Sequence, residues 1–290
     1  MIESLQRTHR FFRDHAIGSR NSTSCWLRWI RWQVGSRLLP FPIEVPWVGG
    51  SRLVMERGMT GATGNYYCGL HEFTDMAFLL HYFAGGSGRF LDVGANIGSY
   101  TILASAVCKV PSIALEPVPS TFANLERNVL ANRLSGLVDA RCTAAGAGHG
   151  TIRFTSDHDT MNHVVGEDYQ GPALRVPVVP LDELLPADLP IPDFWKVDVE
   201  GYEAEVLAGA SRTLSDPAVS VVLLEADGEE IAATMKAAGF HSVAYDPFRR
   251  SLSDPSAGGL HNNYVWVRDP AETESRCRAA RGFEIHGTRF

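Results

Sequence analysis

The stretch at residues 90–100 (FLDVGANIGSY) constrains the fold of this chain more than any other. A short apolar run contains Asp92, a turn carries Gly94 and Gly98, and helical spacing follows over residues 99–107. This order predicts a strand, a tight turn and a helix. Such a unit presents a nucleotide-like ligand at the carboxyl end of a parallel strand.

The centre of this turn indicates which kind of ligand it binds. Dinucleotide-binding turns carry a glycine at the middle position, because the backbone there approaches a pyrophosphate. Asn96 occupies that position, which disfavours an NAD-dependent dehydrogenase. A nucleoside without phosphate fits better, and S-adenosylmethionine is the common one. Glu116 closes the next predicted strand, where a carboxylate accepts hydrogen bonds from a ribose diol and repels a phosphate.

Predicted strands and helices alternate along the rest of the chain. Strands are expected at residues 90–93, 113–115, 138–142, 194–199, 219–225, 242–245 and 264–267, and helices at 99–107, 121–131, 202–214 and 229–238. This alternation predicts right-handed crossovers and a mostly parallel sheet with helices on both faces. No helix is expected between the last two strands, so the last strand should be antiparallel.

Three segments lie outside this alternation. Residues 147–192 interrupt it, with extra strands expected at 150–154 and 175–179 around a polar loop. Residues 269–290 show little pattern and are expected to be a poorly ordered tail. The predicted division is therefore a helical extension and linker at 1–46, an α/β domain at 47–268 and the tail at 269–290.

Residues 1–40 have the spacing of amphipathic helices. One helical face carries an apolar set, and arginines are interleaved with it: Trp26, Ile30, Val34 and Leu38, with Arg28, Arg31 and Arg37. Such a helix could lie on an anionic membrane with its tryptophans at the headgroups. The favoured interpretation is a helix that packs on the α/β domain and leaves its arginines in solvent.

Residues 47–70 begin with a short predicted strand at 52–55. The segment that follows is rich in glycine and also holds Tyr66 and Tyr67, which predicts a loop. This loop could cover a ligand as a lid, or it could be an ordinary cluster of surface turns. A helix is expected from residue 72 to residue 83, just before the first core strand.

Composition bounds the class of protein and its surroundings. The 290 residues are 45% apolar and 20% charged, as in ordinary globular proteins, and the net charge of −7 offers nucleic acid no general attraction. Residues 1–57 hold nine arginines against four acidic residues, a net of +5, which leaves −12 for the remainder. Five scattered cysteines, no cleavable leader pattern and no apolar run of about 18 residues together predict a cytoplasmic protein.

The fourth predicted strand carries charges where a buried strand should be apolar. Alternation places Lys196, Asp198 and Glu200 on one side of it. Three charges there are costly unless they are paired or face the ligand crevice at the carboxyl end of the strand. We therefore expect Asp198 and Glu200 near the reactive end of the ligand. The alternative is an ion-paired strand end, with Glu200 capping the next helix.

The motifs at 90–100, 115–117 (LEP), 180–184 (PLDEL) and 196–203 (KVDVEGYE) together resemble the FkbM family of S-adenosylmethionine-dependent methyltransferases. The resemblance spans about residues 50–268 and implies a Rossmann-like class I methyltransferase fold with a seven-stranded sheet. It also implies O-methylation of a hydroxyl on a sugar, glycan or secondary metabolite. The expected cofactor-binding residues are Asp92, Gly94, Asn96, Gly98, Glu116 and Asp198. An aspartate common at position 147 is Ala147 here.

The sequence also suggests candidates for the base that accepts the hydroxyl proton. Asp198 and Glu200 should repel each other and raise one pKa, which suits a base. His163 is a second candidate, His158 a weaker one, and Lys196 completes the catalytic set. No metal is expected, because no third ligand accompanies Asp198 and Glu200. The alternatives are RNA or protein methylation and S-adenosylmethionine binding without turnover.

Overall fold

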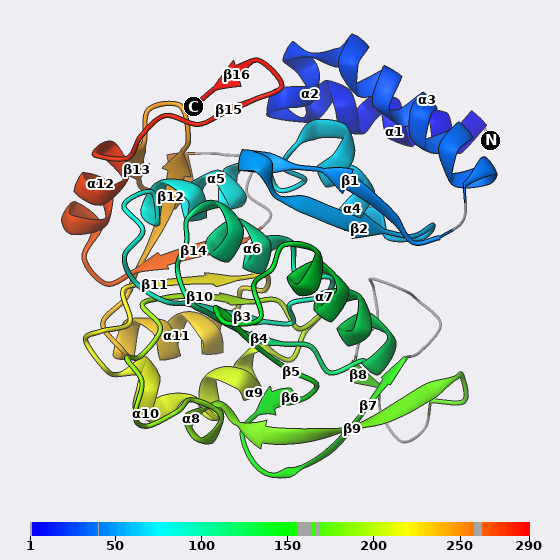
Figure 1. Ribbon diagram of the computed structural model, residues 1–290. Helices are drawn as coiled ribbons and strands as arrows, with labels where there is room; N and C mark the ends of the chain where they lie inside the picture. The colour runs from blue at the N-terminus through cyan, green and yellow to red at the C-terminus, as the bar shows by residue number, and fades with distance from the viewer. Residues whose placement is uncertain (1, 40, 156–163, 166–168, 258–262) are drawn as a thin grey trace.

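The computed structural model describes residues 2–39, 41–155, 164–165, 169–257 and 263–290. At its centre lies a twisted eight-stranded sheet, with helices on both faces (Figure 1). Its strand order is β13-β12-β14-β11-β10-β3-β4-β5. The strands are β3 (Phe90–Val93), β4 (Ser112–Leu115), β5 (Val138–Arg141), β10 (Phe194–Val197), β11 (Val221–Leu224), β12 (His241–Asp246), β13 (Ser251–Ser253) and β14 (Tyr264–Val267).

The predicted sheet is confirmed in type, and it has one strand more than expected. Neighbours from β11 to β5 pair in parallel, whereas β14 runs antiparallel to both β11 and β12, as expected of the last core strand. The eighth strand is β13, a three-residue partner at the edge of β12. It carries no apolar alternation in SLS, so the sequence offered no signal for it.

Apolar side chains on alternate positions of these strands form two separate cores. Phe90, Phe194 and Leu223 face one helical layer, and Leu91, Trp195 and Leu224 face the other. The first layer contains α5 (Phe73–Tyr82), α6 (Ser99–Ile102), the π-helix η2 (Leu103–Val107), α7 (Pro119–Ala131) and α12 (Pro270–Arg278). The second contains α8 (Leu181–Leu184), α9 (Glu203–Ala208), α10 (Ser211–Leu214) and α11 (Glu229–Ala237).

The insertion and the strand just before it form a second sheet of four strands beside the carboxyl end of β5 (Figure 1). Its strands are β6 (Ala144–Gly146), β7 (Gly150–Thr155), β8 (Val164–Val165) and β9 (Ala173–Pro180), in the order β6-β9-β7-β8. The extra strands expected in this region are therefore present. His158 and His163 lie outside the described residues.

The N-terminal region adds a helical layer above the sheet (Figure 1). It comprises α1 (Ile2–Asp14), α2 (Ala16–Arg20), α3 (Ser22–Leu38), β1 (Ile43–Pro46), the 3₁₀ turn η1 (Val48–Gly50), β2 (Arg52–Met55) and α4 (Thr60–Cys68). These elements share an apolar core to which α1, α3, β2 and α4 all contribute. No helix among the described residues is long and apolar enough to cross a membrane.

The structure corrects two expectations for this layer. The loop expected around Tyr66 is instead the helix α4, because Ala62, Tyr67 and Cys68 pack into the N-terminal core and outweigh the glycine content. The prediction of which face of α3 is buried was also wrong. Cys25, Trp32 and Ser36 are its buried residues, whereas most of the predicted apolar face lies in solvent.

The expectation of a poorly ordered tail is wrong. Residues 270–278 form α12, and a hairpin of β15 (Glu284–Ile285) and β16 (Thr288–Arg289) follows. Cys277, Phe283 and Phe290 are buried in the same core as Phe90. Phe283 and Phe290 are too far apart in the sequence to give a periodic pattern, so the sequence did not show that this segment is ordered. The division of the chain into three parts stays a prediction.

Candidate active site

A cavity of about 320 Å³ opens at the carboxyl ends of β3, β10 and β11. From β3 the sheet continues to β4 on one side and to β10 on the other, so the strand order reverses at this point. Open α/β sheets bind their ligands in the crevice at such a reversal. The cavity lining includes Asn65, His71, Glu72, Asp92, Gly94, Asn96, Tyr100, Glu116, Val118, Phe154, Lys196, Asp198, Glu200 and Glu225.

The turn after β3 is held by contacts that explain its glycine and asparagine. A Cβ at Gly94 would lie 1.8 Å from the backbone oxygen of Asp198, because β10 ends directly against this turn. Gly94 also has a φ of +78° and Asn96 a φ of +52°, which are left-handed values that these two residues tolerate. The turn therefore places Asn96 in the lining of the cavity.

Asp92 anchors the start of α6 below this turn. Its Oδ2 accepts hydrogen bonds from the backbone nitrogen of Thr101 at 3.1 Å and from the Thr101 hydroxyl at 2.6 Å. Burial raises the pKa of Asp92 to about 6. Its Oδ1 is buried and has no hydrogen-bond partner among the described residues. One oxygen of Asp92 thus supports the fold, and the other can serve a ligand.

Glu116 crosses from the end of β4 to the turn. One of its oxygens accepts from the backbone nitrogen of Asn96 and the other from that of Val118, both at 2.9 Å. The side chain is buried, which raises the pKa of Glu116 to about 7. Each carboxylate oxygen can accept a second hydrogen bond, so Glu116 can still bind a hydroxyl in the cavity.

Lys196 and Asp198 form an ion pair in the floor of the cavity. The Lys196 Nζ lies 2.5 Å from the Asp198 Oδ2 and 4.8 Å from the centre of the Tyr100 ring. Burial favours the neutral form of each group. For Lys196 it is outweighed by the charges of Asp198, Glu72 and Asp92, and for Asp198 by the charge of Lys196 and a hydrogen bond with Glu225. The pKa of Lys196 is therefore raised and that of Asp198 lowered. Lys196 is therefore the ion-pair partner of Asp198, and a catalytic role for it stays a prediction.

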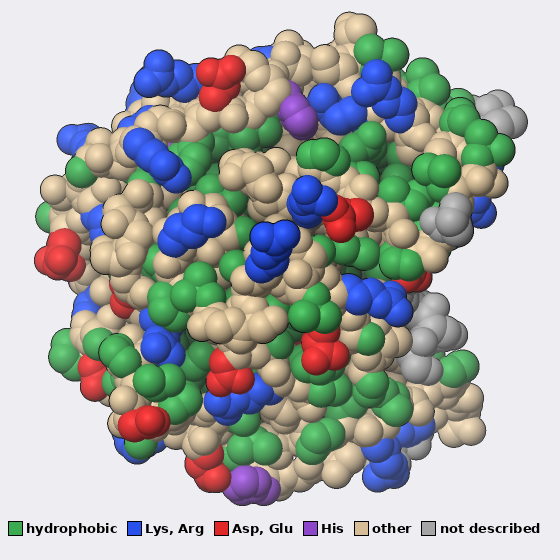
Figure 2. Space-filling view, viewed as in Figure 1, with side chains coloured by type: hydrophobic (Ala, Val, Ile, Leu, Met, Phe, Trp, Pro, Cys, Tyr) green, Lys and Arg blue, Asp and Glu red, His purple; other side chains and the backbone are tan. Residues whose placement is uncertain are grey.

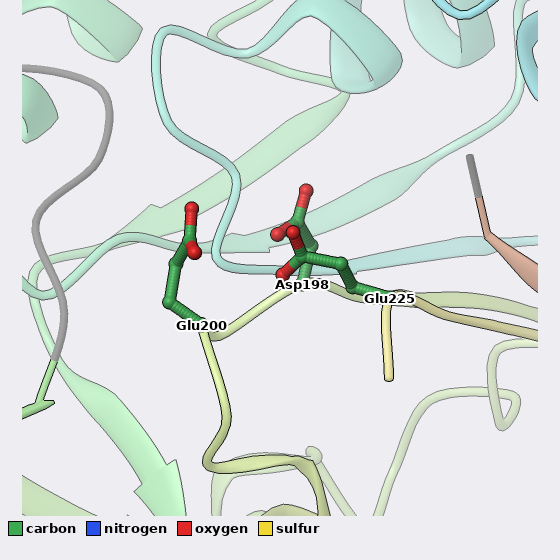
Figure 3. Close-up of side chains that lie close together, drawn as sticks. All are labelled: Asp198, Glu200 and Glu225. Atoms are coloured by element: carbon green, nitrogen blue, oxygen red, sulfur yellow. The ribbon is translucent and has the colours of Figure 1, made fainter. Parts of the chain in front are cut away.

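Glu225 joins Asp198 and Glu200 from the end of β11. Figure 3 shows Asp198 and Glu225 side by side with Glu200 across from them, and one oxygen of each lies within 4.8 Å of the other two. Burial, followed by the hydrogen bond and charge of Asp198, raises the pKa of Glu225 to about 8. Near neutral pH, the protonated Glu225 therefore donates a hydrogen bond to the ionised Asp198.

This arrangement corrects two expectations. The pKa of Asp198 is lowered rather than raised, because Lys196 stabilises its charge, and the pKa of Glu225 is the raised one of these two. The carboxyl group missing from a possible metal site is also supplied by Glu225, so these three residues could hold a divalent cation. The N-cap position of α9 is Tyr202 rather than Glu200. The Oε1 of Glu203 accepts from the backbone nitrogens of Val199 and Gly201 at 3.2 and 3.3 Å.

A sequence model described as the methyltransferase FkbM domain matches residues 92–242, which is 151 of the 290 residues. The chain belongs to the FkbM methyltransferase family. The match begins at Asp92 and ends at Ser242, at the start of β12, so it takes in the turn, Glu116 and the acidic group at the ends of β10 and β11.

Comparisons with individual proteins also give matches. The chain is 33% identical over 135 residues to the hexuronic acid methyltransferase AglP of Haloferax volcanii, covering 46% of this chain and 54% of that protein. It thus spans about half the length of this curated relative. A methyltransferase FkbM from Methylobacillus flagellatus is 16% identical with a TM-score of 0.44, covering 71% of this chain and 52% of that one. A methyltransferase from Agrobacterium tumefaciens is 8% identical with a TM-score of 0.44, over 80% and 71% of the two chains.

The polar side chains that line the cavity suit S-adenosylmethionine, the sulfonium cofactor that this family implies. The lining holds six acidic side chains, of which Glu225 keeps its proton near neutral pH, whereas Lys196 is paired with Asp198. This excess of carboxyl groups favours a cation over a pyrophosphate. The unpaired Asp92 Oδ1 and the remaining acceptor sites of Glu116 offer hydrogen-bond acceptors to hydroxyl and amino groups. The residues present therefore fit S-adenosylmethionine.

The cavity contains most of the residues that the sequence singled out. Asp92, Gly94, Asn96, Glu116, Lys196, Asp198 and Glu200 all line it. Gly98 does not, and a Cβ there would lie 2.5 Å from Leu125 Cδ1, so this glycine permits close packing of α7. Ala147 is likewise absent from the lining.

Sequence reasoning missed His71, Glu72 and Glu225. Glu225 had a signal, because it ends a predicted strand next to the one that carries Asp198. His71 and Glu72 had none, since only the packing of α4 and α5 brings them to the cavity. His71 is held through its backbone nitrogen, which donates to the Asn65 Oδ1 at 2.7 Å, and burial lowers its pKa.

Proposed function

We propose that this chain transfers a methyl group from S-adenosylmethionine to a hydroxyl of a sugar, a glycan or a secondary metabolite. Family membership supports the reaction class, and the hexuronic acid methyltransferase of Haloferax volcanii supports a sugar acceptor. The observation that carries the proposal is the acidic cavity at the β3–β10 reversal. In this cavity, a turn suited to a nucleoside lies beside a pair of carboxyl groups that can accept a proton.

The proposed cofactor contacts follow the order of the strand ends. Gly94 and Asn96 border the cofactor at the turn, Glu116 accepts from its ribose diol, and Asp198 faces its methionine end. The apolar side chains of Val118 and Phe154 also line the cavity and can flank an adenine ring. Asp92 contributes its unpaired oxygen and fixes the turn through Thr101.

S-adenosylmethionine supplies an activated methyl group, so the protein has to align an acceptor oxygen, exclude water and take up a proton. We assign the proton acceptor to the pair formed by Asp198 and Glu225. Lys196 keeps Asp198 charged and fixes its direction. When Glu225 is ionised, the pair can take the hydroxyl proton, and Glu200 lies close enough to orient the acceptor.

Titration calorimetry with S-adenosylmethionine and its demethylated product tests the first half of the proposal. Micromolar binding is expected, with at least a tenfold loss in Glu116→Gln and little change in the exposed control Glu230→Gln. A folded protein that binds neither compound would refute the proposal.

A labelled-methyl assay tests the second half. Glycans that contain hexuronic acid serve as acceptors, beside neutral sugars and RNA. We expect label in a sugar fraction and a loss of about 10²–10⁴-fold in Asp198→Asn. Full activity of Asp198→Asn would refute the catalytic assignment, and label in RNA alone would refute the acceptor class.

A further inference from the structure

Helix α3 has an apolar face that nothing in the described structure covers. It packs on α4 and on the N-terminal core through Cys25, Trp32 and Ser36. On its other side Leu27, Ile30, Val34 and Leu38 are 52%, 49%, 52% and 77% exposed. These four residues recur every three or four positions, so they form one stripe along the helix. Leu39 and Phe41 extend the exposed apolar surface beyond its end.

The two margins of this stripe carry positive charge. At 100° per residue, Arg31 lies on one side of it and Arg37 on the other, and both are exposed. Figure 2 shows hydrophobic side chains beside arginine or lysine side chains over the α3 end of the molecule, at the upper right. Residues 2–39 together hold seven arginines against two acidic residues, in a chain whose net charge is −7.

We propose that this stripe docks on the surface of an anionic lipid bilayer, with α3 parallel to the membrane plane. An apolar stripe flanked by arginines matches the boundary between acyl chains and negatively charged headgroups. The charge concentrated in residues 2–39 adds attraction over the same end of the molecule. No spanning segment is involved, which agrees with the absence of a membrane-crossing helix among the described residues.

The charges argue against a second copy of this chain as the occupant. A symmetric contact between two α3 stripes would bring the arginines of both copies together. An asymmetric contact would need another apolar patch, but the other large apolar residues exposed in the described part of the chain are dispersed. They are Leu5, Leu130, Leu189, Phe248 and Tyr264. A bilayer supplies both the apolar layer and the negative charge.

Vesicle co-sedimentation tests this proposal without cofactor or acceptor. The full chain is mixed with vesicles of phosphatidylcholine alone or of phosphatidylcholine and phosphatidylglycerol in a ratio of about two to one. We expect binding to the mixed vesicles, at least tenfold weaker binding to the neutral ones, and weakening with added salt. Equal binding to both vesicle types, or none to either, would overturn the proposal.

Variants then locate the binding surface. Ile30→Ser combined with Val34→Ser should reduce vesicle binding at least tenfold, whereas the control Leu130→Ser on α7 should leave it unchanged. Arg31→Gln with Arg37→Gln should weaken binding to mixed vesicles several-fold, and Arg249→Gln should not. Circular dichroism of each variant checks folding. A dimer in light scattering that Ile30→Ser with Val34→Ser dissociates would overturn the proposal in favour of self-association.

Discussion

At the scale of single residues, the cavity is defined by carboxyl groups whose charges depend on their neighbours. Asp92 and Glu116 are buried, and each is also engaged with the backbone around the turn. Asp198 stays ionised because Lys196 is beside it, and burial together with the charge of Asp198 keeps a proton on Glu225 near neutral pH. The site can therefore hold a cation and still accept a proton.

Replacement of Glu225 by Gln tests this arrangement through the pH dependence of methyl transfer. The pKa of Glu225 is raised to about 8, so the group is mostly protonated at neutral pH and ionises as the pH rises. If it acts as the proton acceptor, kcat/KM should rise about tenfold per pH unit below this value and level off above it. Glu225→Gln should remove this rise and lower the rate by about 10²–10⁴-fold. An unchanged profile would contradict the assignment, and Glu230→Gln is the matched control.

At the scale of elements, Arg268 ties the end of β14 to the neighbouring helices. Its guanidinium donates to the backbone oxygens of Val219, Ala238, Leu214 and Asp216 at 2.6–3.1 Å. Arg268→Lys can satisfy few of these acceptors, so we expect it to lower the free energy of unfolding by about 2–3 kcal/mol. The exposed Arg249→Lys should change it by less than about 0.5 kcal/mol. Urea unfolding measures both changes. An Arg268→Lys variant with the same unfolding midpoint as the unsubstituted protein would refute this role of Arg268.

The elements that the sequence predicted well are those with a strong local signal. The core strands combine apolar runs with turns at their ends, and Asp198 and Glu116 were found because charges at strand ends are unusual in a buried sheet. Helix α4 and the contribution of His71 were missed. Gly64 shows why: a Cβ there would lie 2.0 Å from the His71 Nδ1, a contact that exists only once α4 packs beside residue 71. Tertiary packing, rather than local propensity, decides such segments.

At the scale of the whole molecule, the two ends of the chain meet the core of the central sheet. Ile17 from α2 and Phe290 belong to the same apolar core as Phe90, and the Asn21 side chain donates to the Thr288 hydroxyl at 2.9 Å. Phe283 and Phe290 also exchange two backbone hydrogen bonds at 3.0 Å. A chain closed in this way should unfold as one cooperative unit.

Replacement of Phe290 by Ala tests this closure. The side chain is 3% exposed and packs on Phe73 and His81, so its loss should lower the free energy of unfolding by about 3–5 kcal/mol. Half of the tryptophan fluorescence signal arises in the N-terminal helices, which hold three of the six tryptophans, whereas circular dichroism reports on the whole chain. Because α2 shares the core with Phe290, both signals should shift together to lower denaturant, whereas Leu130→Ala should shift neither. A fluorescence transition that stays in place while the dichroism transition moves would show that the N-terminal helices unfold independently of the sheet.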